Sequence, residues 1–362
     1  MNGKVLKLFV LGLLVTIMAS LVIGCGGTEQ AQEETAPAQS GEPEKVYEFK
    51  LAHHEPTGSP LNIRFEEWAK EVEKKSEGRI KIKVYPGETL GKGRDMLPMI
   101  EQGVTDIGWV VIPFFPGQFL TAEGLAMPML GAGSSKAAAL TLWDLYQANE
   151  DMQQAFSKVK VVCFTASGYQ FLATSKKKVE KLEDLQGLNI RVPGWGASEF
   201  MKAAGGSPIF MPPPEMYEAL EKGVIDGYIL DWLGTDSNRL YEVANYVCNV
   251  PIISNPQSLL MNKAKFASLP PDLQEIMDEM GGAWGSEYIT SCFDESDAPG
   301  IENFTKLDKE VYELAPEEQA RWKEVARPIW NMWIETNKDK IDAQQAIDQY
   351  IELVDENNRK FE

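Results

Sequence analysis

The sequence predicts an α/β fold of two lobes followed by a helical C-terminal region. Two stretches alternate short apolar strands with amphipathic helices, the first over 46–112 and the second over about 159–232. From about residue 269 onward the apolar residues follow helical spacing. Removing the first 45 of 362 residues leaves about 317, which is too many for one ordinary core and enough for two lobes.

The first α/β unit has the order β-α-β-α-β, which is typical of an open, largely parallel sheet. Its predicted elements are a strand at 46–51, a helix at 61–72, a strand at 80–84, a helix at 93–103 and a strand at 105–112. The first strand runs into His53 and His54 and stops at turn residues. Open sheets of this kind bind ligands at the carboxyl ends of their strands, so either histidine is a candidate contact, and a solvated strand end is the alternative.

The second unit predicts strands at 159–175, 188–194 and 226–232, with helices at 198–205 and 216–223 between them. Residues 243–262 resemble a strand that crosses back to the first sheet. We therefore expect lobe I to contain 46–165 plus about 250–275, and lobe II to contain 166–249 plus part of the C-terminal helices. The helical region over about 276–362 would then span both lobes.

The N-terminus has the pattern of a lipoprotein signal. Two lysines precede an apolar run over 8–23, which ends directly before Gly24 and Cys25. We expect a signal peptide over 1–24 and a diacylglyceryl group on the Cys25 thiol, which places the protein at the outer face of the cytoplasmic membrane. A plain signal anchor or an ordinary cleaved signal is the alternative, although the apolar run is short for a spanning helix. Residues 26–45 lack large apolar side chains, so 25–45 predict a lipidated cysteine and a flexible tether.

The overall charge limits the partners. A formal net charge of −19 argues against nucleic acid and against an anionic lipid surface. Any site for an anion must therefore be a local positive spot. The three remaining cysteines are odd in number and two lie in apolar strands, so buried free thiols are expected, with one disulfide as the alternative.

One arginine stands out as such a spot. Arg191 lies between Ile190 and Val192 on a strand that reads as buried. A guanidinium cannot shed its charge, so burying it is costly unless an anion meets it. That anion is a candidate ligand. An internal ion pair, or a strand-end arginine that reaches solvent, is the alternative.

The sequence contains no recognisable catalytic or metal-binding set. Its two histidines are adjacent and would face opposite sides of a strand, so they cannot chelate one metal together. No HExxH, CxxC, calcium loop or GxSxG elbow accompanies them. We therefore nominate no catalytic residue and expect no metal and no cofactor.

Several motifs in one order resemble a known family. They are LAHHEPTGSP, EGRIKIKVYPGETLG, EQGVTDIG, TSKKKVEKLEDLQGLNIRVPG, GGSPIFMPPPEMYEALEKGVIDG and MNKAKFASLPPDLQEIM. From Tyr47 to about Asn337 the chain resembles the substrate-binding subunits of tripartite ATP-independent periplasmic (TRAP) transporters, the DctP-like group.

The resemblance implies a two-lobed clamshell, as in periplasmic binding proteins, in which strands and a long helix cross between the lobes. It implies a receptor that performs no covalent chemistry and closes on a small organic acid. The closed form would dock on the small and large membrane subunits of a cation-driven permease. The family's carboxylate-binding arginine corresponds to Arg191.

Two departures from better-known family members bear on the ligand. Gln170 stands where those members have a second arginine, and Leu230 stands where they have a ligand-contacting asparagine. Together these changes favour one carboxylate on an apolar or aromatic body, with a C4-dicarboxylate as the alternative; Gln170 could bond a hydroxyl. The expected substrate-binding residues are Arg191, Gln170, His53, His54, Trp109, Trp195, Met211, Leu230 and Trp232. For the tryptophans and Met211, ordinary core packing is the alternative.

Two other functions are consistent with the same fold and the same arginine. A ligand-sensing receptor lobe for a membrane kinase would share the fold. An exported enzyme acting on carboxylic acids would share the arginine.

Overall fold

A computed structural model describes residues 45–361. The expected signal peptide, Cys25 and nearly all of the tether lie outside these residues. The strands are β1 Tyr47–Ala52, β2 Ile80–Tyr85, β3 Ile107–Val111, β4 Val159–Thr174, β5 Asn189–Val192, β6 Ser207–Phe210, β7 Gly227–Leu230, β8 Tyr246–Asn262 and β9 Glu310–Tyr312. The helices up to the second long strand are α1 Pro60–Lys75, α2 Met96–Glu101, α3 Leu120–Glu123, α4 Ser135–Ala148, α5 Glu150–Ala155, α6 Trp195–Ala203, α7 Met216–Glu221 and α8 Trp232–Ser237. The remaining helices are α9 Lys263–Ala267, α10 Pro271–Glu279, α11 Gly282–Thr305, α12 Pro316–Asn337 and α13 Ala343–Phe361.

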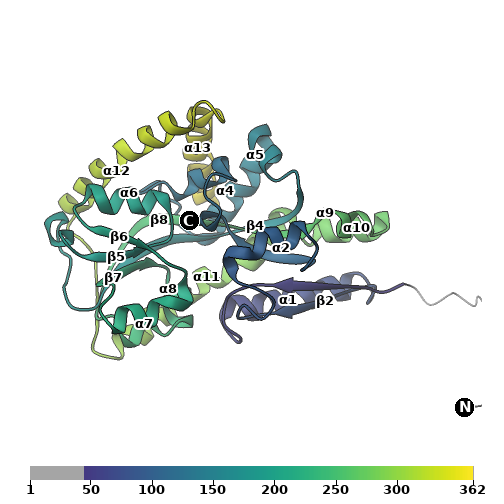
Figure 1. Ribbon diagram of the computed structural model, residues 1–362, viewed down its shortest axis with the longest axis horizontal. Helices are drawn as coiled ribbons and strands as arrows, with labels where there is room; N and C mark the ends of the chain where they lie inside the picture. The colour runs from purple at the N-terminus through teal and green to yellow at the C-terminus, as the bar shows by residue number, and fades with distance from the viewer. Residues whose placement is uncertain (1–44, 362) are drawn as a thin grey trace, which may run out of the picture. The chain divides into compact units, whose positions relative to one another are not determined.

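Two long strands join the halves of the sheet. The strand order is β2-β1-β3-β8-β4-β7-β5-β6, with β9 paired to β8. β4 and β8 are antiparallel partners along most of their length, and Figure 1 shows them between β5–β7 at one end and β2 with α1 at the other. This matches the expected crossing strand at 243–262. The strand expected at 159–175 has nearly its expected length and is a second crossing strand.

The pairing makes the strand ends of both halves converge. β1 and β3 run parallel to each other, and β3 pairs with the end of β8 that faces the first half of β4. β7 runs antiparallel to β4, so that its last residue, Leu230, lies opposite Phe171. The carboxyl ends of β1, β3 and β7 therefore point toward the middle of β4. A sheet of this type binds ligands at such ends.

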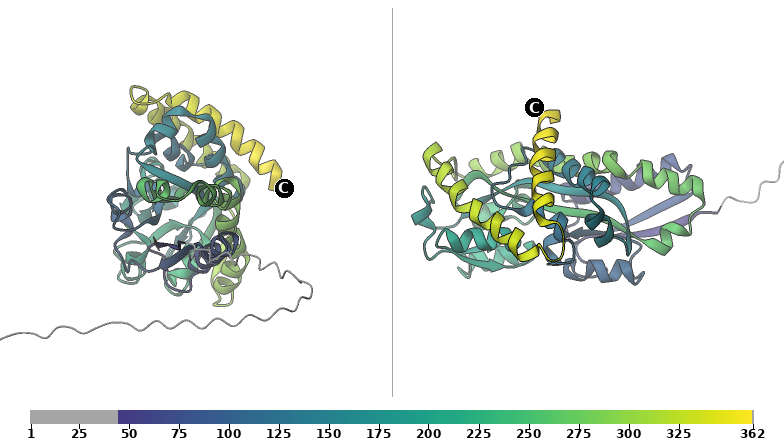
Figure 2. Two further views of the ribbon diagram at one scale, coloured as in Figure 1. Left: turned by 90° about the vertical axis from the view of Figure 1, so that its right-hand side faces the viewer. Right: turned by 90° about the horizontal axis from the view of Figure 1, so that it is seen from above.

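Apolar cores cover both faces of each half of the sheet. In the first half, one core lies beneath α1 and α10 and another beneath α4. In the second half, one core includes α6 and Trp322 of α12, and the other includes Trp232 of α8. Trp322 and Trp333 of α12 are therefore both part of apolar cores. α12 and α13 form an outer layer on one side of the sheet (Figure 2).

The long helix α11 contacts elements of both halves. It packs against α1, α4, β4 and α8. Cys163, Cys248 and Cys292 are buried free thiols, which confirms the expectation and leaves no disulfide among the described cysteines. Within residues 45–361 no helix is long and apolar enough to cross a membrane.

Candidate functional site

A cavity lies where the converging strand ends meet. About 390 Å³ of space, part of it open to solvent, separates its lining atoms. Its polar lining residues are His54, Glu55, Gln170, Arg191, Asp231, Asn255 and Gln257. Its apolar lining residues are Trp109, Val111, Phe114, Leu230, Leu233 and Phe293, with Pro213 and Gly234 completing the lining. The lining thus offers polar groups for a charged group and apolar side chains for a carbon body.

Arg191 lies at the inner wall and is only 1% exposed. Its Nε donates to the Met211 carbonyl at 2.9 Å and its Nη1 to the Ile229 carbonyl at 2.8 Å. Two of the five guanidinium N–H groups are used in this way, so three remain on Nη1 and Nη2. Those two nitrogens can form the paired contact that a carboxylate requires.

No carboxylate of residues 45–361 lies within 4.0 Å of the Arg191 guanidinium. The internal ion pair considered as an alternative is therefore absent at contact distance, and the arginine does not reach solvent. Burial lowers the pKa of Arg191 to about 9, and the negative charge of Asp231 opposes that shift. The guanidinium remains protonated at neutral pH.

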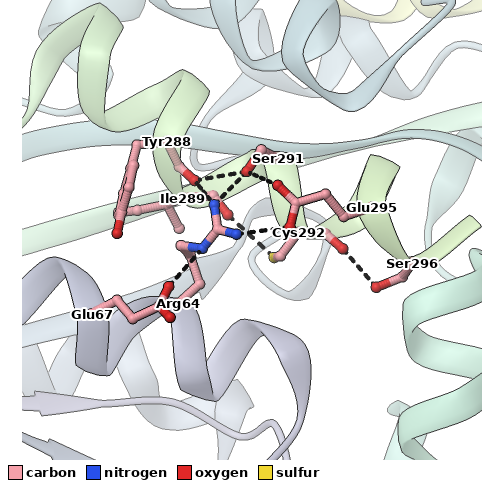
Figure 3. A network of polar contacts seen from close by, with 8 residues as sticks. All are labelled: Arg64, Glu67, Tyr288, Ile289, Ser291, Cys292, Glu295 and Ser296. Carbon is pink, nitrogen blue, oxygen red and sulfur yellow. Dashed lines mark hydrogen bonds and ion pairs between the residues drawn. The ribbon is translucent and has the colours of Figure 1, made fainter.

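Arg64 shows how a structural arginine differs. It extends from α1 to α11, where Nη1 donates to the Tyr288 carbonyl at 2.6 Å and Nη2 pairs with Glu295 at 2.8 Å (Figure 3). Ser291 accepts a further bond and Glu67 pairs with Nε at 3.2 Å. Every nitrogen of Arg64 meets an acceptor in the chain, whereas Nη2 of Arg191 is left for a ligand.

His54 and Trp109 form the aromatic wall. Their rings stack with centroids 4.8 Å apart, and Trp109 Nε1 donates to Thr165 at 2.9 Å. Burial, together with the nearby charges of His53 and Arg191, lowers the pKa of His54 to about 3. His54 is therefore a neutral ring at physiological pH.

Gln170 and Asp231 form a second polar pair. Gln170 Nε2 donates to Asp231 Oδ2 at 3.0 Å, and Asp231 Oδ1 accepts from the Gly234 N–H at 2.8 Å as the N-cap of α8. Burial raises the pKa of Asp231, and these two hydrogen bonds oppose the shift. Gln170 lies in the irregular stretch of β4 between Ser167 and Leu172, where the register with β8 shifts on both sides of it.

The structure brings five of the nine expected residues into the cavity. They are Arg191, Gln170, His54, Trp109 and Leu230. Met211 contributes a carbonyl oxygen to Arg191 instead of a side chain to the lining. His53 is buried behind the cavity against Asn62, at 3.2 Å, so neither histidine is a solvated strand end.

Two expected tryptophans lie elsewhere. Trp232 is buried in the core of the second half, with its ring centroid 4.4 Å from that of Phe171. Trp195 is 37% exposed and lines a separate groove with Phe114 and Phe210. Core packing was the stated alternative for Trp232, and the structure shows it.

Sequence reasoning missed the acidic residues. Glu55 directly follows His54 after β1, and Asp231 directly follows Leu230 after β7. Both positions are carboxyl ends of strands, which is the signal that could have identified them. Asn255, Gln257 and Phe293 carried no comparable signal.

Among residues 45–361, the buried Glu55 carboxyl group has no cationic partner at contact distance. The basic side chain beside it is His54, whose Nε2 lies 3.8 Å from Glu55 Oε1 and whose ring is neutral. Burial and the negative charge of Asp231 raise the pKa of Glu55 to about 8. At neutral pH in the empty cavity, Glu55 is largely protonated.

This shift predicts a pH-dependent stability difference between the wild type and Glu55→Gln. Between the ordinary value of 4.5 and about 8, the unfolded chain has released the Glu55 proton while the folded protein keeps it. The contribution of Glu55 to the free energy of unfolding is therefore fully present below pH 4.5 and is lost as pH rises to about 8. The free energy of unfolding of Glu55→Gln minus that of the wild type should rise over this window, by up to about 1.4 kcal/mol per pH unit. The difference between the two melting temperatures, measured across the same pH range, should rise with it. A flat difference from pH 4.5 to 9 would contradict the assignment.

Most of the chain matches a known protein family. The family model described as bacterial extracellular solute-binding protein, family 7 (DctP) matches residues 51–337. The chain belongs to this family. The solute-binding protein is 25% identical over 260 residues to the 2,3-diketo-L-gulonate-binding periplasmic protein YiaO of Escherichia coli, covering 69% of this chain and 78% of that protein. It is 24% identical over 293 residues to a solute-binding protein of Albidiferax ferrireducens, covering 77% of this chain and 84% of the relative.

Solved structures share the fold. A TRAP solute-binding protein of Rhodoferax ferrireducens, in complex with co-purified benzoate, matches with a TM-score of 0.84 at 24% identity, covering 88% of this chain and 100% of that one. A TRAP periplasmic solute-binding protein of Desulfovibrio salexigens in an open complex matches with a TM-score of 0.76 at 27% identity, covering 88% and 97%. The expected two-lobed fold and the assignment to the TRAP solute-binding proteins are confirmed.

Proposed function

We propose that this solute-binding protein binds a small organic acid through Arg191 and delivers it to the membrane subunits of a TRAP transporter. The observation that carries the proposal is a fully buried guanidinium that has no carboxylate partner among residues 45–361 and lines a cavity with apolar side chains. A ligand carboxylate would supply the missing anion, and Trp109, Phe114 and Phe293 would pack against its carbon body.

The relatives support an acidic ligand. The Rhodoferax protein holds benzoate, and a Bordetella bronchiseptica relative with a TM-score of 0.79 holds mandelate. The aromatic side chains of this cavity suit ligands of that shape. We propose further that the protein performs no covalent chemistry, and its membership of a solute-binding family supports this.

The test is to identify what the protein binds. The full-length protein is extracted from membranes and mildly denatured, and the released ligand is identified by mass spectrometry. A thermal-shift screen of mono- and dicarboxylates, including aromatic ones, follows on the emptied protein. We expect a carboxylate to be released or to raise the melting temperature. The proposal would be refuted if only uncharged compounds raised the melting temperature. It would also be refuted if no acid was released and no acid raised the melting temperature.

We propose that the mature protein is held at the membrane by a lipid on Cys25. The support is the apolar run at 8–23 that ends before Gly24 and Cys25. Intact-mass measurement of the membrane-extracted protein should show loss of residues 1–24 and the added mass of a diacylglyceryl group. A mature chain without added lipid would contradict the anchor.

A further inference from the structure

The cavity contains more buried acid than base. Glu55 is 5% exposed and Asp231 is 7% exposed, and both line the same cavity as Arg191. The two carboxyl groups are close enough for the charge of Asp231 to act on Glu55, and Arg191 is the one cation among the lining residues. Glu55 is largely protonated at neutral pH, so Arg191 and Asp231 balance each other until a ligand carboxylate pairs with Arg191.

The unpartnered polar atoms in the lining are mainly hydrogen-bond acceptors. Among residues 45–361, the lining atoms that are buried without a partner are Gln170 Oε1, Glu55 Oε2, Asn255 Oδ1 and His54 Nδ1. The orientation of the Gln170 amide is determined, because Asp231 accepts from its NH₂ group. Gln170 Oε1 is therefore an acceptor beside Asp231 that has no donor among residues 45–361 and is free to accept from a ligand.

Arg191 and Glu55 line the cavity from different elements. Arg191 lies on β5, whereas Glu55 follows β1. A carboxylate bound by Arg191 would remove the one cation that balances Asp231. It would also leave Glu55, Asp231 and Gln170 as a group of acceptors beyond it.

We propose that the ligand is zwitterionic, with its carboxylate on Arg191 and a cationic nitrogen held by Glu55, Asp231 and Gln170. An ammonium group has three N–H donors and no acceptor, which matches this group of acceptors. The proposal rests on the proposed function, since it takes the Arg191 carboxylate contact as given and adds a second group to the ligand.

The placement of charges favours this ligand over a simple acid. With a simple monocarboxylate, Arg191 alone would face the ligand anion and Asp231, and Glu55 would stay protonated without a donor beside it. With a zwitterion, the ligand adds no net charge, and its cation lies beside the two carboxyl groups. The ionised form of Glu55 becomes favourable when a cation binds, so binding should release a proton near pH 7.

The test uses matched acids that differ only in one substituent. One series is phenylalanine, phenyllactate and phenylpropionate; the other is 4-(aminomethyl)benzoate, 4-(hydroxymethyl)benzoate and 4-methylbenzoate. In calorimetry with the wild type, we expect the amine of at least one series to bind at least about tenfold more tightly than its hydroxyl and hydrogen counterparts. Glu55→Gln should remove that preference and the proton release, while still binding the plain acids.

The control variant is Glu123→Gln. Glu123 is also a partly buried glutamate, but it lines a different pocket and accepts from the Gly117 N–H at 2.7 Å. It should keep the preference for amines. Mass spectrometry of the ligand retained on purification provides an independent result: an acid with a basic nitrogen supports the proposal, and a nitrogen-free acid overturns it.

The outcomes separate this inference from the proposed function. Plain acids that bind as tightly as their amines, with Glu55→Gln unchanged, would overturn the zwitterion and leave the carboxylate receptor intact. Both would be overturned if amines bound equally well without any carboxylate. Both would also be overturned if no acid bound and the retained ligand was neutral.

Discussion

Arg191→Ala should lower the affinity for the carboxylate ligand by on the order of 100-fold, which corresponds to about 3 kcal/mol. The variant removes the charge and the paired N–H groups that face the cavity, and no other lining residue is a cation that could replace them. Isothermal titration with the acid identified from the purified protein measures the loss. The same acid should no longer raise the melting temperature of the variant.

The empty variant should still fold. Removing Arg191 gives up two hydrogen bonds to the Met211 and Ile229 carbonyls, but it also removes the cost of burying a charge without a partner at contact distance. Arg191→Met fills more of the vacated space and serves as the second variant. Arg191→Lys keeps the charge but cannot form the two-nitrogen contact, so we expect intermediate affinity.

Arg64→Ala is the matched control. Arg64 is paired by Glu295 and Glu67 and bonded to the Tyr288 carbonyl, so its loss should lower the melting temperature (Figure 3). It does not line the cavity, so the affinity of the folded variant should be unchanged. If Arg191→Met bound the acid as tightly as the wild type does, the carboxylate would have to bind elsewhere. If neither Arg191→Ala nor Arg191→Met folded without ligand, Arg191 would have a structural role.

The strands and helices of both α/β units were predictable from the sequence because their signals are local. Alternation marked β1 and β2, and apolar residues at helical spacing marked α1 and α12. Arg191 was identified because a charge within a buried strand is unusual whatever the topology. Gln170 and Leu230 were identified by comparison with the family pattern, and both line the cavity.

The composition of the cavity depended on topology. Glu55 follows β1 and Asp231 follows β7, and 175 positions separate them (231 − 55 − 1). They meet because β7 runs antiparallel to β4 and points its carboxyl end toward that of β1. Without that pairing, two acids in a chain of 54 acidic residues carry no signal. Trp232 was misplaced for a related reason, since a strand-end tryptophan packs under the following helix or faces the cleft according to how that helix starts.

Gly168→Ala should destabilise the folded protein by about 3 kcal/mol, a typical cost of forcing atoms into a packed core. Gly168 lies in the irregular stretch of β4, where its N–H donates to Ser135 Oγ at 2.9 Å and its carbonyl accepts from Ser254. A β-carbon there would overlap the backbone of Ser134 and Ser135 at the start of α4. Backbone atoms cannot rotate away, so β4 or α4 must shift.

The displacement would also reach the cavity. Gln170 lies two residues beyond Gly168 and supports Asp231 at 3.0 Å, so a shift of this stretch should weaken ligand binding as well as stability. Thermal unfolding measures the first effect and calorimetry the second. Gly133→Ala is the matched control near the same helix start, because its β-carbon would meet only the Asn358 side chain, with the nearest atom at 3.3 Å. If Gly168→Ala melted within about 1 °C of Gly133→Ala, the close approach of β4 to α4 would not be the constraint that positions Gln170.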